Sequence, residues 1–299
     1  MRNHVFIALL LTVFVSAAPA AEPPPFEINM DRVEVNHKGT FADSKTYFIP
    51  TIYLRIAAKT TTSVRNKSAS AKMRVFTEGL DKAMLQSLAK KIYDDLVAKV
   101  RAAGFTVLTY DDLKADLVTV DRMQPNPKFG FPTKFFALGS PIEFAIVAPS
   151  DEQTLDWGSA WPITPYQGIA KGKKVVVLVP EVYFTLPEVW ATKESNSMFD
   201  KAGVNFAPTM KLFISRVWGL PPSLGGCYIL VQAHDKRLAA EVAGSMRKVA
   251  GQNNKYGDWS QAVGDYDFVL DPAAFSTGIL RVGYALNDLT AKTIKSAQH

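Results

Sequence analysis

The sequence predicts an α+β protein in which a mixed or antiparallel sheet carries a long amphipathic helix, a second helix and a C-terminal helix. Three segments have apolar residues at helical spacing, and several shorter segments are rich in β-branched and aromatic residues, as strands are. Hydrophobic residues make up 47% of the chain and charged residues 21%, which is the composition of a folded globular protein. The chain of 299 residues is long enough to bury a core without disulfide bonds.

The N-terminus has the pattern of a signal peptide. Arg2 supplies a positive charge, Val5–Val15 is an apolar run, and small residues at Ala18 and Ala20 suit cleavage after Ala20. The apolar run is shorter than the roughly 20 residues that a membrane-spanning helix needs. A retained N-terminal anchor is the alternative interpretation. We expect cleavage, no further transmembrane segment, and a periplasmic or secreted protein.

The remainder is expected to have two parts. Residues 21–45, which begin with a proline run, are predicted to form an extended leader, and residues 46–299 to form a single α+β domain. Within that domain, residues 123–172 form a Pro/Gly-rich insertion that we expect to be dominated by loops with exposed aromatic residues. Long structured loops often carry binding sites, but they also often only cover a core.

The first half of the domain predicts a strand, a helix and a strand. Thr51–Ala57 and Lys72–Phe76 have strand composition, and the polar Ser/Thr stretch between them is expected to be a loop. Leu80–Ala103 is expected to be an amphipathic helix that Gly104 ends. Its apolar residues recur every four positions: Met84, Leu88, Ile92, Leu96 and Val100. The sequence FTVLTY then predicts the second strand of the unit.

The second half predicts mostly strands. Lys174–Val179, Pro208–Trp218 and Cys227–Ala233 are strand candidates, and the tight connection GLPPSLGG favours an antiparallel hairpin between the last two. Within the middle candidate, Met210, Leu212 and Ile214 are expected to face one way, and Lys211 and Ser215 the other.

Two helices are expected near the C-terminus. Asp235 can cap a helix that runs to about Ala250 with four apolar residues on one stripe: Leu238, Val242, Met246 and Val249. A polar, aromatic loop is expected next. Asp271 and Pro272 then have the residue types of an N-cap and a first helical position. The last helix carries a stripe of Phe275, Ile279, Val282, Leu286 and Leu289, which we expect to pack on the sheet.

Catalytic motifs are hard to find in this sequence. Cys227 and His234 would lie about 23 Å apart on opposite faces of one strand, too far for a thiolate and its base. We therefore expect Cys227 to be buried and inert. Ser87–Lys90 matches an SxxK pattern without its partner motifs, and the two useful histidines are too few for a zinc site. We expect no catalytic residue, no metal and no cofactor.

Basic residues dominate one stretch of the chain. The full chain has a net charge of +6, and Ser44–Thr77 contains seven basic residues and no acidic one. This stretch is either a solvated strand pair or a surface for an anionic partner. The candidate binding residues are Arg55, Lys59, Arg65, Lys67, Lys72 and Arg74, together with Trp157 and Trp161 of the Pro/Gly-rich insertion.

The order of elements and the string DYDFVLDPAAFSTGILRVGYALNDLTAKTIKSA resemble a known group of proteins. Both are similar to exported bacterial envelope proteins related to the curli-secretion channel subunit and the TolB N-terminal domain. This chain departs from the channel subunit because no cysteine follows the apolar run of the signal peptide. The resemblance implies a non-catalytic accessory protein of the cell envelope.

The sequence therefore favours an exported, non-catalytic envelope accessory protein. Its partner would be an envelope protein or an anionic surface or polymer, and no nucleic acid is expected. One alternative is a secreted hydrolase that uses dispersed carboxylates, for which Asp265 and Asp267 are the candidates. Another is a periplasmic binder of a small ligand that stacks on Trp157, Trp161 and Trp259.

Overall fold

The computed structural model confirms the α+β fold class. It describes residues 26–65, 69–138, 140–156, 164–195, 200–223, 225–232, 239–256 and 259–298. The predicted signal peptide, Lys67, Trp157, Trp161 and His234 lie outside these ranges. None of the helices in the described ranges combines the length and the apolar composition needed to cross a membrane.

The described residues form one 13-stranded mixed sheet and one two-stranded sheet. The strands of the large sheet are β1 (Val33–Asn36), β2 (Thr46–Ile49), β3 (Tyr53–Arg65), β4 (Ala69–Glu78), β5 (Thr106–Thr109), β6 (Thr133–Leu138), β7 (Ser140–Val147), β8 (Val176–Thr185), β11 (Thr209–Leu220), β12 (Cys227–Gln232), β13 (Ala239–Val242), β14 (Gly244–Tyr256) and β15 (Trp259–Leu270). The small sheet pairs β9 (Glu188–Ser195) with β10 (Asp200–Ala207). The helices are α1 (Lys82–Ala102), α2 (Tyr110–Leu113), α3 (Thr164–Lys173) and α4 (Pro272–Ala297), with short 3₁₀ turns η1 (Met30–Arg32) and η2 (Lys38–Asp43).

The main path through the large sheet runs β1-β12-β11-β8-β3-β4-β15-β14. The predicted hairpin is confirmed, because β11 and β12 pair antiparallel with Gly219 opposite Cys227. Strand β3 is central: it pairs with β8 in parallel, and with β7 and β4 antiparallel. Consequently β3 contacts segments from both halves of the sequence.

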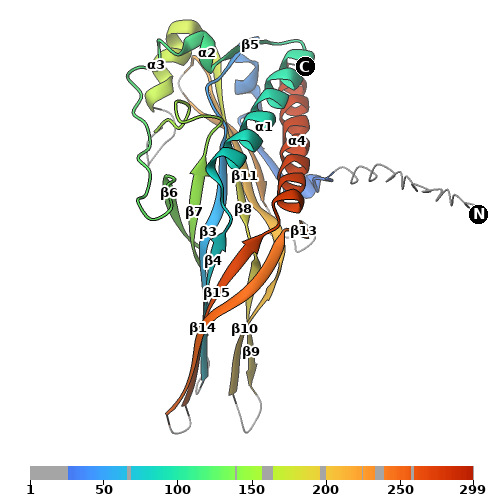
Figure 1. The fold of residues 1–299 in the computed structure, drawn as a ribbon. Helices are drawn as coiled ribbons and strands as arrows, with labels where there is room; N and C mark the ends of the chain where they lie inside the picture. The colour runs from blue at the N-terminus through green and yellow to red at the C-terminus, as the bar shows by residue number, and fades with distance from the viewer. Residues whose placement is uncertain are drawn as a thin grey trace, which may run out of the picture.

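Helices α1 and α4 lie side by side on one face of the sheet (Figure 1). The predicted apolar stripe of α4 is confirmed, since all five of its residues are buried. Asp271 caps α4 by accepting hydrogen bonds from the backbone of Ala273 and Ala274, at 2.9 and 3.0 Å. Helix α1 ends as expected, because Gly104 adopts a φ of +99° that glycine tolerates best. Burial of the two stripes gives the protein its main core.

The opposite face of the sheet is covered at one end by a second core. Helix α3 packs there with Tyr166 and Ile169, and the segment after α2 contributes Leu117. The Tyr53 hydroxyl of β3 donates a hydrogen bond to the carbonyl oxygen of Leu155, at 2.6 Å. Side chains on both faces of β3 are therefore buried in the body of the protein.

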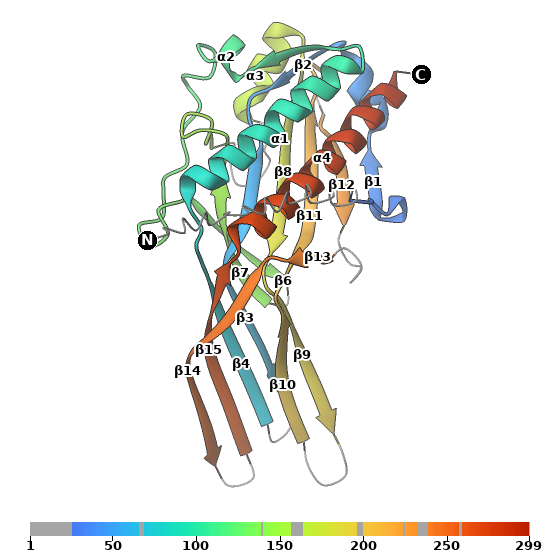
Figure 2. The same ribbon diagram turned by 45° about the vertical axis from the view of Figure 1, so that its right-hand side comes forward.

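Long hairpins project from the body at the end opposite α2 and α3 (Figure 2). They are formed by β3–β4, β14–β15 and β9–β10. This corrects the prediction of a polar loop between the first two strands, because most of that stretch, Thr60–Arg65 and Ala69–Ala71, is strand. Its polarity was misleading: Thr62 and Val64 are buried on one face, opposite Met73 and Ala71, and threonine is well suited to strands.

The helix predicted from Asp235 to Ala250 is wrong wherever that segment is described. Residues 239–242 and 244–256 form strands β13 and β14, and β14 pairs along its length with β15. Val242 and Val249 of the expected stripe are 58% and 60% exposed. The described residues of the polar loop predicted after it are likewise strand. Pairing with β15 outweighs the helical spacing of a segment that contains Gly244 and Gly251.

Two other predicted regions contain more regular structure than expected. Within the predicted leader, β1 pairs antiparallel with β12, and Phe41 of η2 is fully buried in the main core. Within the Pro/Gly-rich insertion, β6 and β7 form a hairpin, and β7 pairs with β3. Phe131, one of the aromatic residues of this insertion, is buried, with 5% of its surface exposed.

Candidate functional site

The hairpin end of the sheet carries the predicted basic residues on one face. We call the paired parts of β3, β4, β15 and β14 beyond Lys59 the hairpin sheet. One of its faces carries Tyr266, whose ring lies 6.2 Å from that of Phe206 in β10, and this face buries Met73 and Val75. The other face carries Lys59, Arg65, Lys72 and Arg74. We call this second face the basic face.

Part of the basic face is neutralised by acidic side chains of β15. Arg74 donates two hydrogen bonds to Asp265, at 2.6 and 2.7 Å, from the directly opposite position of the ladder. Arg247 of β14 contacts both Glu78 and Asp267, at 2.9 and 2.7 Å. The hydrogen bonds with Asp265 raise the pKa of the Arg74 guanidinium further above its ordinary value. These pairs neutralise Arg74 and Arg247.

Two lysine side chains contact the ring of Phe76, close to the ion pairs of Arg74 and Arg247. The Lys59 ammonium lies 5.5 Å from the centre of the Phe76 ring, and that of Lys128 lies 5.1 Å from it. Lys128 comes from the Pro/Gly-rich insertion and also lies 5.2 Å from the centre of the Phe129 ring. Cation–π contacts of this kind hold ammonium groups in place without neutralising them.

Arg65 and Lys72 are cations of the outer part of the basic face. Both are exposed, and neither has an ion-pair partner in the described part of the chain. Ser63 pairs with Lys72 and Arg65 with Ser70, so the two cations are diagonal neighbours. Diagonal side chains on one face of a sheet lie about 7–8 Å apart. The two charges can thus act on one anionic partner.

Arg55 does not belong to this surface. Its side chain is 1% exposed and forms an ion pair with Glu181 of β8, which is itself buried. The prediction counted Arg55 as a surface charge because only its own strand was considered. In the fold, the face of β3 that carries Arg55 is covered, and Arg55 is removed from the candidate binding surface.

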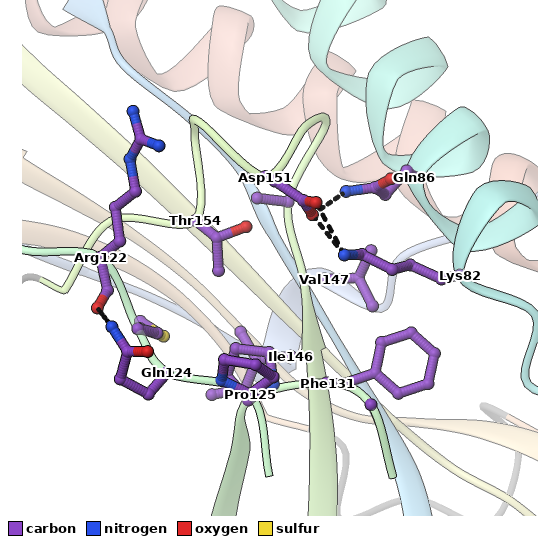
Figure 3. A pocket seen from close by; sticks show the side chains of 14 residues that line it. Lys82, Gln86, Arg122, Gln124, Pro125, Phe131, Ile146, Val147, Asp151 and Thr154 are labelled. Atoms are coloured by element: carbon purple, nitrogen blue, oxygen red, sulfur yellow. Dashed lines mark hydrogen bonds and ion pairs between the residues drawn. The ribbon is translucent and has the colours of Figure 1, made fainter. Parts of the chain in front are cut away.

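The Pro/Gly-rich insertion lines a cavity of about 240 Å³ beside the start of α1 (Figure 3). Phe131, Ile146 and Val147 form apolar parts of its wall. At the rim, Asp151 accepts hydrogen bonds from Lys82 and Gln86, both at 2.8 Å. The bond from Lys82 is the main reason that the pKa of Asp151 is lowered. At the rim of the cavity, Asp151 and Lys82 therefore neutralise each other, next to the apolar wall.

The residues considered for catalysis have ordinary structural surroundings. Cys227 is buried in a strand, as predicted, and burial raises the pKa of its thiol to about 12, so it stays protonated at neutral pH. Asp265 and Asp267 are held by Arg74 and Arg247. Within the described ranges, no group of three or more His, Cys, Asp or Glu side chains is arranged to hold a metal ion.

Sequence reasoning missed the residues that balance the charges of the hairpin sheet. Arg247 was placed in a helix, and the partnership of Arg74 with Asp265 joins positions 191 residues apart. Lys128 was not selected although it lies in the insertion. A correct hairpin prediction for 244–270 would have placed Arg247 opposite Asp267.

Comparison with known proteins finds no matching family model and no curated protein with a significant match.

Proposed function

We propose that this protein is an exported, non-catalytic envelope protein that associates with an anionic lipid surface through the basic face of its hairpin sheet. The observation that carries the proposal is the free pair of cations, Arg65 and Lys72, at the part of the hairpins that projects from the body. An exposed basic side chain near an anionic bilayer contributes about 1 kcal/mol of attraction. A small set of such residues supports weak and reversible association.

The distribution of charge supports this location for the contact. Toward the body, Arg74 and Arg247 are balanced by carboxylates, whereas the outer part of β3–β4 keeps its positive charge. The elongated shape also matters, because projecting hairpins can reach a surface that the body does not touch (Figure 2). A surface with unbalanced charge at the end of a projection is well placed for electrostatic association.

Export is part of the same proposal and rests on the first twenty residues. If Arg2, the apolar run Val5–Val15 and Ala20 act as a signal peptide, the mature chain begins at Ala21. We expect mass spectrometry of protein recovered from the periplasm or the culture medium to show Ala21 as the first residue. An unprocessed chain that starts at Met1 would contradict the export part of the proposal.

Reversing the two free charges is expected to abolish membrane association. In sedimentation with phosphatidylglycerol vesicles, the variant Arg65→Glu/Lys72→Glu should bind at least tenfold more weakly than the wild-type mature protein. Two attractions of about 1 kcal/mol are lost and two repulsions are gained, and each 1.4 kcal/mol corresponds to a factor of ten. Wild-type binding should also disappear at high salt, because exposed charges are screened within about 8 Å at physiological ionic strength.

The control variant is Lys91→Glu/Lys114→Glu, which changes net charge by the same amount on exposed residues of α1 and of the segment after α2. It should bind like the wild type. Equal loss in both variants would show that only net charge matters, and unchanged binding of the first variant would refute the role of the basic face. Equal binding to phosphatidylcholine vesicles would contradict an electrostatic mechanism.

A further inference from the structure

The ion pair of Arg55 and Glu181 lies within a larger group of charged and aromatic residues. Strands β3, β8 and β11 run side by side through the body (Figure 1). Glu181 lies directly opposite Tyr53 on one neighbouring strand and opposite Arg216 on the other. These side chains therefore share one face of the sheet. We call Arg55, Lys134, Glu181 and Arg216 the Arg55 cluster.

Glu181 satisfies only part of the Arg55 guanidinium. One terminal nitrogen, Nη2, donates to Oε1 of Glu181, while Nε and Nη1 are buried and have no hydrogen-bond acceptor among the described residues. The rings of Tyr53 and Tyr183 lie 5.6 and 5.0 Å from the guanidinium carbon, and they offer faces rather than lone pairs. A buried donor without an acceptor is rare and costly. These two nitrogens of Arg55 could each donate a hydrogen bond to an additional acceptor.

Each carboxylate oxygen of Glu181 already accepts a hydrogen bond from another donor. Its second oxygen, Oε2, accepts a hydrogen bond from the indole nitrogen of Trp218, at 3.3 Å. The ring of Trp218 in turn supports Arg216, whose guanidinium carbon lies 4.7 Å from the ring centre. The second arginine is thereby held on the same face, and its guanidinium makes no hydrogen bond to the described residues.

Lys134 of β6 adds a third cation. It is paired with Phe144, whose ring packs on Tyr183 at 5.2 Å. Partial desolvation of its ammonium group and the proximity of Arg55 both lower the pKa of Lys134, although Glu181 and Asp156 act in the opposite direction. Arg55, Lys134 and Arg216 thus place three cations near Glu181. The cluster reaches solvent at Lys134, which is exposed, and at Arg216, which is half-buried.

We propose that the Arg55 cluster is a binding site for a small anion that carries a carboxylate or phosphate group. Its oxygens would accept hydrogen bonds from Arg55 and Arg216 and would receive the charge of Lys134. Arginine forms strong, charge-assisted hydrogen bonds with both kinds of group. This site lies in the body of the protein, on different residues from the basic face, and does not depend on the membrane association proposed above.

The test is a titration of the mature protein by calorimetry and thermal unfolding, at constant ionic strength, with three probes: inorganic phosphate, benzoate and chloride. Phosphate or benzoate should bind saturably and raise the melting temperature, whereas chloride should do neither. Preference for one of the two identifies the group that the site selects. Benzoate binding should also change the fluorescence of Trp218, because its ring lies beside Arg216.

The variants Arg216→Gln and Lys134→Gln should each weaken this binding about tenfold, as expected for the loss of one charge-assisted hydrogen bond. Lys114→Gln is the matched control and should bind like the wild type. Arg216 and Lys134 are used because neither is fully buried, so the variants are expected to fold. The proposal is overturned if neither phosphate nor benzoate acts differently from chloride, or if both variants bind with wild-type affinity.

Discussion

Glu181→Ala is expected to destabilise the protein by about 3–5 kcal/mol, because it leaves the Arg55 guanidinium buried without a counter-charge. Arg55 is 1% exposed, and Glu181 is its only ion-pair partner among the described residues. The Trp218 indole also loses the acceptor for its hydrogen bond to Oε2. Urea unfolding of the purified mature protein, with the midpoint compared with that of the wild type, measures the effect.

The double variant Arg55→Met/Glu181→Leu should recover most of this loss. Removing both charges together leaves no buried ion, and apolar residues of similar volume often replace a buried pair without net cost. A double variant that is as unstable as Glu181→Ala would show that packing, rather than the unpaired charge, causes the effect. A single variant with wild-type stability would contradict the burial of the pair.

Phe275→Ala should cost a similar amount, about 3–5 kcal/mol, through loss of burial and the cavity that remains. Phe275 is fully buried in the first turn of α4, where that helix contacts the main core. Urea unfolding of the purified mature protein also measures this effect. Phe135→Ala removes the same atoms from a residue that is 64% exposed and should change stability by less than about 0.5 kcal/mol. Equal effects at the two positions would contradict the docking of α4 on the sheet.

The two long helices were predictable because their determinants are local. In α4, the N-cap residue, the proline after it and the apolar stripe all occur within one continuous segment, and the structure contains each of them. Helix α1 has the same property, with Asp81 as its N-cap and Gly104 at its end. A helix satisfies its own backbone hydrogen bonds, so distant residues are not needed to recognise it.

The hairpins were not predictable in this way, because their residues are specified by partners far along the chain. Strand β4 pairs in parallel with β15, about 190 positions away. The stripe of Val242, Met246 and Val249 satisfies helical spacing, but it cannot reveal that β15 offers a pairing edge. Polar strands are also hard to distinguish from loops when the strand is exposed on one side.

The wrong placements of single residues have equally specific causes. In β11 the register shifts between Leu212 and Ile214, and the side-chain alternation changes phase there. Ser215, expected to face away from Met210 and Leu212, is 2% exposed. One extra residue in a strand reverses which face its side chains occupy, and nothing in the local sequence marks it. Arg55 was misplaced because its partner, Glu181, lies 126 residues away.

The central claim is that the basic face of the hairpin sheet contacts an anionic surface. Hydrogen–deuterium exchange of the mature protein with and without phosphatidylglycerol vesicles tests it most directly, because exchange reports which backbone segments become protected. Slower exchange along Lys59–Phe76, absent with phosphatidylcholine vesicles, is the predicted result. Protein that binds the vesicles with protection confined to α1 and α4, or that does not bind them at all, would contradict the claim.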